Sequence, residues 1–263
     1  MSKKFKLGVV GDPIEHSLSP FIHSRFSRNE NINLNYLAYR VNNDELDIFI
    51  KEFFQDKEAR GLNITLPHKK RAALLEGKIS QEARYINAVN TIVKENDKLL
   101  LFSTDGAGFI NDIENKKFNL KNKNILIIGA GAAVESILYR VATAKPMKIT
   151  VINRTIEKAD RLIRKFGNMT KIRSEVEIDK PFDLVINGSS AGLTGNFFPE
   201  ENIPLTSKTY FYDLNYSLTE TPFCKELQAL RANSNAFSCP IVLYISASAG
   251  VNELFNKFSN DSA

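Results

Sequence analysis

The sequence predicts an α/β protein built from two domains, and two observations support this prediction. Short apolar runs alternate with helical patterns through the first part of the chain, and the middle part opens on a strand, a glycine-containing turn, a helix and a second strand. Strands that alternate with helices favour a doubly wound parallel sheet. The 263 residues are enough for two ordinary domains, each with its own core.

The first part of the chain carries both strand and helix patterns. Ser19 precedes a proline at the first helical position, so we expect it to cap a helix. Asn96 and Asp97 separate two apolar runs and predict a hairpin. The predicted strands are 7–11, 37–41 and 61–66, the helices 20–28 and 44–55, and the hairpin strands 88–93 and 98–102.

The middle of the chain has a different pattern. Its continuous apolar run at 125–128 is typical of a parallel strand that is covered on both faces. We expect strands at 123–129, 148–152, 182–186 and 210–213, a helix at 133–144 and another from 241 onward. The prediction is therefore a Rossmann-like, doubly wound nucleotide-binding domain at 106–236, inserted into an N-terminal α/β substrate domain that comprises 1–105 with 237–263.

Composition narrows the class of protein. The net charge of +5, from 35 basic and 30 acidic residues, is too diffuse to indicate nucleic acid. The basic cluster at 68–71 reads either as a nucleic-acid or targeting patch or, as we favour, as the solvated start of a helix. Cys224 and Cys239 have no zinc-ligand spacing. Without an apolar run of membrane length or a signal peptide, we expect a cytoplasmic protein with no metal, membrane or nucleic-acid partner.

A dinucleotide site is predicted directly after the apolar strand. Gly129 and Gly131 fit the first two glycines of the dinucleotide fingerprint, which permit a tight turn and a close approach of the pyrophosphate to a helix N-terminus. Ala132 follows at the start of that helix. Val134 departs from the pattern, because the third position usually holds a small residue. A glycine-rich turn without a ligand is the alternative.

The residues after the next strand favour NADP over NAD. An NAD enzyme places a carboxylate there for the ribose 2′-hydroxyl. This chain instead has Asn153, Arg154 and Thr155, with Lys158 one turn later. A guanidinium and an ammonium are suited to a 2′-phosphate. A surface turn that is basic by chance is the alternative.

Lys69 and Asp105 are the candidate catalytic pair. Reduction of a ketone requires a proton donor for the developing alkoxide. No tyrosine is followed four residues later by lysine, and cysteine and histidine are too few for a catalytic zinc site. Lys69 follows a predicted strand and Asp105 ends the hairpin. From spacing alone, a surface lysine and a loop aspartate without a role remain the alternative.

Several motifs together resemble the shikimate dehydrogenase family. They occur in family order and spacing over most of the chain, at 11–20, 63–69, 88–91, 104–106, 129–131, 153–155, 187–193 and 212–216. The resemblance implies that NADPH reduces 3-dehydroshikimate to shikimate, reversibly, in aromatic amino-acid (chorismate) biosynthesis. It also implies hydride transfer assisted by the Lys69–Asp105 pair, with shikimate or 3-dehydroshikimate as the small-molecule partner.

The same resemblance implies roles for further residues. Ser17 and Ser19 would bind the substrate carboxylate, while Thr65 and Asn90 would bind ring hydroxyls together with the catalytic pair. Tyr216 would complete the substrate site, Ser246 stands where the family has a substrate-binding glutamine, and Ser189 is a candidate cofactor contact. Ser19 as a helix cap, and Asn90 as a partner of loop backbone, are the structural alternatives.

The sequence departs from the family at several positions, which are Asn87, Leu101, Ser103, Ala132, Glu135 and the segment 238–247 around Ser246. These departures leave two alternatives open. One is a paralogue that acts on quinate or another cyclic polyol acid, and the other is a non-enzymatic NADP-binding sensor. A sensor has no need of the Lys69–Asp105 pair. We expect a monomer or a homodimer.

Overall fold

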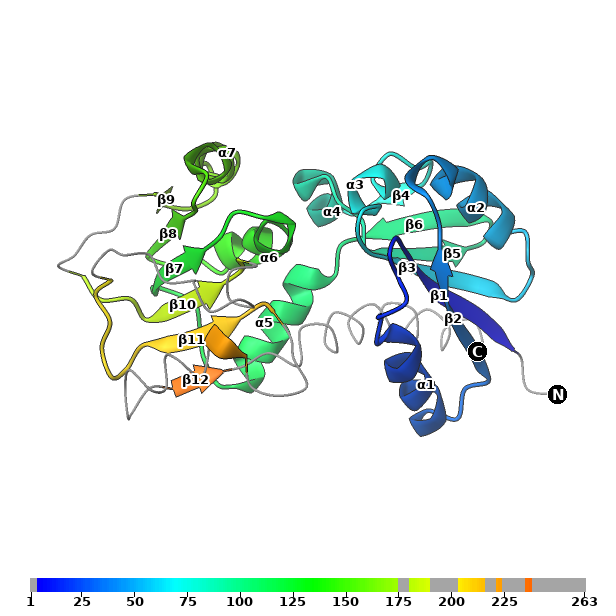
Figure 1. Cartoon of the computed structure of the whole chain (residues 1–263), viewed down its shortest axis with the longest axis horizontal. Coiled ribbons are helices and arrows are strands. Elements are labelled where there is room, and N and C mark those ends of the chain that lie inside the picture. Colours follow the sequence, from blue (N-terminus) through cyan, green and yellow to red (C-terminus); the bar gives the residue numbers. More distant parts are fainter. Residues whose placement is uncertain (1–3, 175–179, 190–202, 216–220, 224–234, 238–263) are drawn as a thin grey trace. The chain divides into compact units, whose positions relative to one another are not determined.

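The structure is a computed structural model that describes residues 4–174, 180–189, 203–215, 221–223 and 235–237. Within these ranges the chain forms two compact units, residues 4–108 and the described parts of 109–237 (Figure 1). The predicted boundary at 105/106 lies three residues before the observed division at Gly108. The predicted return of the chain to the first domain, and the helix expected from 241, lie outside the described residues.

The first unit contains a mixed sheet of six strands in the order β2-β1-β3-β5-β6-β4. β1 pairs in parallel with both β2 and β3, whereas β3, β5 and β6 pair antiparallel. Strands 5–11 and 98–102 agree with prediction within two residues. The strands are β1 (Phe5–Gly11), β2 (Leu34–Arg40), β3 (Ala59–Ile64), β4 (Lys78–Ile79), β5 (Thr91–Glu95) and β6 (Lys98–Phe102).

The two faces of this sheet have separate cores. Leu7 and Val9 of β1 pack in one cluster with Tyr36, while Val10 belongs to a second cluster with Ile50 of α2 (Leu46–Phe53). This alternation follows from the two-residue period of a strand. α1 (Ser19–Asn29) lies on the first face, because its buried His23 stacks on the Tyr36 ring.

Two sequence predictions for this unit are wrong in detail. Ser19 does not cap α1, because the N-cap position is Leu18 and Ser19 is already helical. His68 is not part of a solvated cluster, because it is fully buried with Nε2 at 2.8 Å from the Val41 carbonyl oxygen. The helices of this unit that sequence analysis did not predict are α4 (Gln81–Ile86) and α5 (Asp105–Asn115), which begins in the first unit and ends in the second. η1 (Asn43–Glu45) overlaps the start of the predicted helix 44–55, and α3 (Lys69–Ala72) lies at the helix start expected at 68–71.

The second unit contains a parallel sheet of six strands in the order β12-β11-β10-β7-β8-β9. Counted from β7, this is the 3-2-1-4-5-6 order of the doubly wound dinucleotide-binding fold. The order reverses between β7 and β10, which is where such folds bind their ligands. The strands are β7 (Asn124–Ile128), β8 (Lys148–Ile152), β9 (Ile172–Arg173), β10 (Leu184–Asn187), β11 (Tyr210–Asp213) and β12 (Asn235–Phe237).

The apolar run in the sequence has the burial that a covered parallel strand requires. All five residues of β7 are buried. α6 (Ala132–Thr143) connects β7 to β8, and α7 (Ile156–Phe166) follows β8 (Figure 1). The predicted strand–turn–helix–strand unit is therefore confirmed. No helix in the described parts of the chain is long and apolar enough to cross a membrane.

Candidate active site

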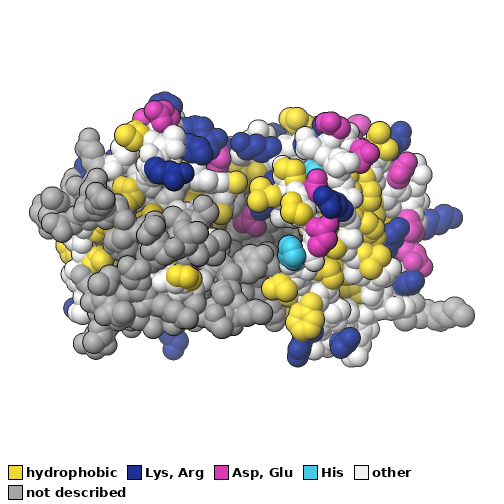
Figure 2. All heavy atoms as spheres, viewed as in Figure 1, with side chains coloured by type: hydrophobic (Ala, Val, Ile, Leu, Met, Phe, Trp, Pro, Cys, Tyr) yellow, Lys and Arg dark blue, Asp and Glu magenta, His cyan; other side chains and the backbone are white. Residues whose placement is uncertain are grey.

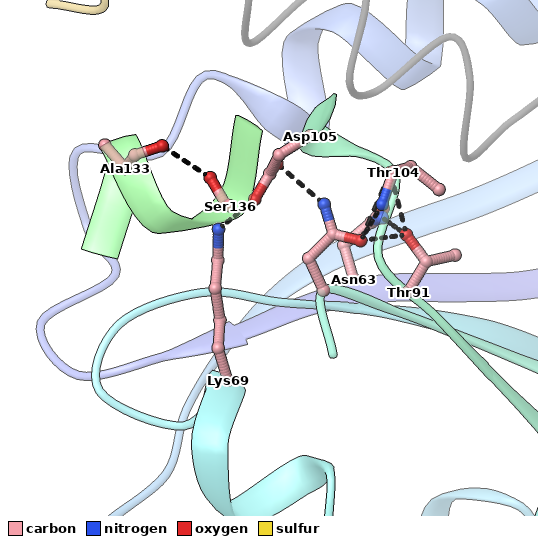
Figure 3. Close-up of polar contacts among 8 residues, drawn as sticks. Asn63, Lys69, Thr91, Thr104, Asp105, Ala133 and Ser136 are labelled. Atoms are coloured by element: carbon pink, nitrogen blue, oxygen red, sulfur yellow. Dashed lines mark hydrogen bonds and ion pairs between the residues drawn. The ribbon is translucent and has the colours of Figure 1, made fainter. Parts of the chain in front are cut away.

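Lys69 and Asp105 form an ion pair within the first unit. Lys69 is the first residue of α3 and Asp105 the first of α5, and Nζ lies 2.6 Å from Asp105 Oδ2 (Figure 3). The two side chains are 26% and 13% exposed, so the pair is partly shielded but reachable from solvent. One of the three ammonium donors faces Asp105, which leaves two for a ligand. The pair can therefore hold and donate a proton.

Asn90 fixes the other carboxylate oxygen. Its Nδ2 donates to Asp105 Oδ1 at 2.7 Å, and its Oδ1 accepts from Thr91 Oγ1 at 3.0 Å and from the backbone N–H of Thr104 at 2.9 Å. Asn90, Thr91 and Thr104 are all buried. Both oxygens of Asp105 thus face donors, which hold the carboxylate in one orientation.

A second group of polar side chains joins this one through Asn63 on β3. Asn63 Nδ2 donates to Thr91 Oγ1 at 3.3 Å, and its Oδ1 accepts from the Tyr36 hydroxyl at 2.8 Å. Tyr36 also hydrogen-bonds Ser19, and its burial raises the pKa of its phenol. A chain of hydrogen bonds therefore runs from Ser19 to Asp105. Sequence analysis left out Tyr36, because a tyrosine in an apolar strand carries no signal of a polar partner across the sheet.

The remaining predicted substrate residues of the first unit lie in loops next to β1 and β3. Ser17 Oγ accepts from the backbone N–H of Ser19 at 3.3 Å, which leaves the Ser17 proton available to a ligand. Thr65 follows β3 and lies close to Gly11. A Cβ added to Gly11 would be only 2.6 Å from Thr65 Cγ2. Gly11 is thus a position where a side chain would displace Thr65.

The phosphate loop of the second unit lies where the sheet order reverses. Gly129 has φ of +107°, and a Cβ there would be 2.8 Å from the backbone of Gly188. Gly131, Ala132 and Ala133 are exposed at the start of α6, and a Cβ on Gly131 would meet nothing within 4 Å. The helix N-terminus therefore faces open space that an anion can approach.

Val134 allows α6 to pack closely against the sheet, because the residue that faces it, Gly188, has no side chain. A Cβ on Gly188 would collide with Val134 Cγ2, and Val134 itself is fully buried. Gly188 follows β10 and supplies the room that the third fingerprint glycine usually gives. The departure at Val134 thus has a local compensation.

Basic side chains gather around the loop after β8. Arg154 and Lys158 are exposed, and neither side chain has a hydrogen bond or ion pair with the part of the chain that the structure describes. Figure 2 shows Lys and Arg side chains at the upper left, over the position of α7 in Figure 1. Thr155 is the N-cap of α7. Asn153 is already engaged, because Oδ1 accepts from Ala130 N at 3.0 Å and Nδ2 donates to the Thr155 carbonyl at 2.8 Å.

Glu135 does not contribute a free negative charge beside this loop. It is buried on α6, with Lys165 Nζ at 2.8 Å and Arg161 at 3.0 Å from its two oxygens. The pairing neutralises the acidic residue that stands where a basic one is common, and it links α6 to α7. Two of the basic residues of α7 are therefore occupied, whereas the Arg154 and Lys158 side chains have no partner among the described residues.

Ser189 lies just after β10 in a partly buried polar network. Its N–H and hydroxyl both donate to Asn187 Oδ1, at 3.1 and 2.8 Å, and its carbonyl accepts from Asn215 at 2.9 Å. Asn187 and Asn215 each donate to Asp213 Oδ1 at 3.0 Å. Burial raises the pKa of Asp213, against these donors. Tyr216 and Ser246 lie outside the described residues.

The departure from the family at Asn87 has a structural explanation. Asn87 is the C-cap of α4 in the left-handed conformation, with φ of 56°, which glycine and asparagine both tolerate. Asparagine can therefore stand where the family has glycine. Among the described residues, no three His, Cys, Asp or Glu side chains are grouped so as to hold a metal ion.

A doubly wound sheet with an open phosphate loop, together with an α/β unit that carries a lysine–aspartate pair, defines a two-domain dinucleotide-dependent oxidoreductase. Comparison with known families identifies which one. Residues 9–92 match the shikimate dehydrogenase substrate binding domain, and residues 112–197 match the shikimate / quinate 5-dehydrogenase family. The shikimate dehydrogenase (NADP(+)) of Laribacter hongkongensis is 36% identical over 228 residues, 85% of this chain and 83% of that protein.

Solved structures agree with these matches. A shikimate dehydrogenase in complex with NADP+ superimposes with a TM-score of 0.85 at 28% identity, covering 97% of this chain and 92% of that one. The Thermus thermophilus shikimate 5-dehydrogenase in complex with NADP(H) and shikimate gives 0.83 at 26% identity, covering 96% and 94%. The chain belongs to the shikimate dehydrogenase family.

Proposed function

We propose that the chain is an NADP-dependent shikimate dehydrogenase that reversibly reduces 3-dehydroshikimate to shikimate. The relatives carry this name, and the solved relatives bind NADP and shikimate. The observation that carries the proposal is the Lys69–Asp105 ion pair of 2.6 Å, held from its other side by Asn90. A sensor that only bound NADP would not need this arrangement.

The residues of the second unit fit NADP. The open space over Gly131 and the amides at the start of α6 suit a pyrophosphate, and the exposed cations Arg154 and Lys158 suit a 2′-phosphate. Gly129 and Ala132 would border the pyrophosphate. Asn153 and Thr155 would shape the 2′-phosphate site, and Ser189 would lie beside the cofactor at the end of β10. Bound NADPH would supply a hydride to the substrate carbon.

The residues of the first unit would bind the substrate and manage its proton. Ser17 and Ser19 would hold the carboxylate with their hydroxyls, and Thr65 and Asn90 would hold ring hydroxyls. Lys69 Nζ would donate a proton to the ketone oxygen as it becomes an alkoxide, and Asp105 would orient that nitrogen. In the reverse direction the same nitrogen would take the proton back. Tyr216 and Ser246 would complete the substrate site.

The proposal is tested by the formation of NADPH when the purified chain is given NADP with shikimate, with quinate or with no substrate. We expect turnover with shikimate that is at least ten-fold more efficient in kcat/KM than with quinate, since about 1.4 kcal/mol of discrimination gives this ratio. Preference for quinate would indicate the paralogue acting on another polyol acid. Binding of NADP without turnover of either acid would indicate the sensor.

The biological setting completes the proposal. We propose that the chain acts in the cytoplasm in aromatic amino-acid biosynthesis, with small molecules as its partners, as a monomer or a homodimer. Sedimentation analysis of the purified protein distinguishes the two assemblies.

A further inference from the structure

The orientation of one amide decides whether Asp105 meets a donor or an acceptor. Asn90 presents Nδ2 to Asp105 Oδ1 at 2.7 Å, and the reverse orientation would place two acceptor oxygens against each other. Two acceptor oxygens in contact repel each other, so the Asp105 carboxylate would no longer be held in place against Lys69. Whatever fixes the Asn90 amide therefore acts on the catalytic pair.

Three donors converge on the oxygen of this amide. Asn90 Oδ1 accepts from the Thr104 backbone N–H at 2.9 Å, the Thr104 hydroxyl at 3.1 Å and the Thr91 hydroxyl at 3.0 Å. A backbone N–H can only donate, so the atom that faces it must be the oxygen. The two hydroxyls strengthen this assignment only if their protons point the same way.

The Thr91 proton is directed by its other neighbour. Thr91 Oγ1 accepts from Asn63 Nδ2 at 3.3 Å, and Asn63 in turn is oriented by the Tyr36 hydroxyl that donates to its Oδ1. An amide nitrogen can only donate, so the Thr91 proton remains for an acceptor. Asn90 Oδ1 at 3.0 Å is nearer than the Thr104 hydroxyl oxygen at 3.4 Å, and the Thr104 hydroxyl itself donates to Asn90. Thr91 is fully buried, so bulk water does not replace this bond.

We propose that Thr91 is a positioning residue for the Lys69–Asp105 pair, which it orients through the Asn90 amide. The inference rests on the proposed function. Thr91 touches neither Lys69 nor Asp105 in any contact that the structure gives. Its side chain joins two polar groups of the sheet, because β3 and β5 pair Asn63 directly opposite Thr91.

The test is Thr91→Val, which keeps the shape of the side chain and removes only the hydroxyl. Loss of one buried hydrogen bond should lower kcat for shikimate by roughly three- to ten-fold and leave the KM for NADP unchanged. Thr91→Ser keeps the donor and should restore most of kcat. Thr150→Val is the matched control, because the Thr150 hydroxyl is also fully buried in a strand but has no partner among the described residues.

A double-mutant cycle shows whether Thr91 acts through Asn90. In an Asn90→Ala background, Thr91→Val should have no further effect on kcat, because the amide it orients is gone. Equal effects in both backgrounds would overturn the proposal. Should Thr91→Val fail to fold, Thr104→Val removes the other hydroxyl from the same oxygen and should give the same change in kcat, whereas wild-type kcat in that variant would overturn the proposal.

The outcomes separate this inference from the proposed function. A wild-type chain that does not oxidise shikimate shows that the proposed function is wrong. Wild-type turnover combined with equal kcat for Thr91→Val and Thr150→Val overturns the role of Thr91 alone. A reduced kcat that Thr91→Ser does not restore assigns the effect to packing and also overturns that role.

Discussion

The two units prepare their ligand sites in opposite ways. In the first unit, the polar side chains bond one another, from Ser19 through Tyr36 and Asn63 to Asp105. In the second unit, the phosphate loop offers backbone and open space, and the Arg154 and Lys158 side chains have no partner among the described residues. The first site is a closed network, whereas the glycine turn and the two cations of the second site have no hydrogen bond to each other in the contacts that the structure gives.

This difference has an energetic consequence. Groups in one hydrogen-bonded network couple, so that removing one changes what the others contribute, whereas contacts without shared partners add. Substitutions in the first unit should therefore be non-additive and transmitted over several residues. Substitutions around the phosphate loop should act locally and affect one ligand group each.

The largest expected effect is at the catalytic pair. Lys69→Ala and Asp105→Ala should each lower kcat by about 10²–10⁴-fold, the usual value of general acid–base help, with little change in NADP binding. Because the two residues act as a unit, the double variant should be scarcely slower than either single one. Lys6→Ala is the control. Lys6 forms an ion pair with Asp56, with 3.0 Å between Nζ and Oδ2, and neither residue belongs to the network. If the fold reduction in kcat of the double variant equals the product of the two single reductions, the two residues act independently and the site is not a network.

The 2′-phosphate contact should give the next largest effect. Arg154→Ala removes a charge-assisted contact worth about 1.5–3 kcal/mol, so the Kd for NADP should rise about ten-fold or more. Binding of NAD should change little, because it has no 2′-phosphate. Arg164→Ala is the control, an exposed arginine in the last turn of α7. Titration calorimetry with both cofactors measures these values, and an equal loss for NADP and NAD would contradict the assignment.

The two glycines of the phosphate loop separate folding from binding. Gly129→Ala places a side chain at φ of +107° and against the Gly188 backbone, so it should destabilise the fold by about 1–3 kcal/mol. Gly131→Ala has φ of −84° and no neighbour within 4 Å, so the free energy of unfolding should stay within about 0.5 kcal/mol while NADP binds more weakly. Urea unfolding and NADP titration of both variants test this. Similar stability of the two variants would contradict it.

The sequence predicts the second unit better than the first for a physical reason. Each part of the second site, the strand 125–128 with its glycines and the basic residues after β8, is a short run of neighbouring residues with a recognisable pattern, and the strand–turn–helix–strand order places the two runs at one end of the sheet. The network of the first unit depends on register, since Asn63 meets Thr91 only because β3 and β5 pair at that position, and Tyr36 meets Asn63 27 residues away. No local pattern predicts which hydroxyl faces which amide.

The elements missed by sequence analysis also have identifiable causes. α5 begins at Asp105, but Gly106 and Gly108 in its first turn weaken the helical pattern. Phe109 and Ile113, four residues apart and fully buried, are the signal that would have indicated this helix. Ser19 matched a cap signal, yet the helix begins one residue earlier than expected, and its hydroxyl serves Tyr36 instead.

The smallest expected effect is a loss of stability at low pH, caused by a histidine that is buried beside the network. His23 is buried against the Tyr36 ring, with centroids 4.0 Å apart, and neither ring nitrogen has a hydrogen-bond partner among the described residues. Burial lowers the pKa of His23 to about 4. His23 therefore binds its proton near pH 6.5 in the unfolded chain and only near pH 4 in the folded chain. The stability that this difference supplies is complete above pH 6.5 and is lost as the pH falls from 6.5 to about 4.

At pH 5.5 this difference amounts to about 1.4 kcal/mol. His23→Phe keeps an aromatic ring beside Tyr36 and cannot bind the proton. It should therefore remove this part of the pH dependence of unfolding between pH 7 and 5.5. Urea unfolding of both proteins at the two pH values measures the difference, with His16→Phe as the control because His16 is exposed. An equal loss of stability in His23→Phe and the native chain would show that His23 takes up its proton without unfolding, and that the first unit is less closed than its hydrogen bonds imply.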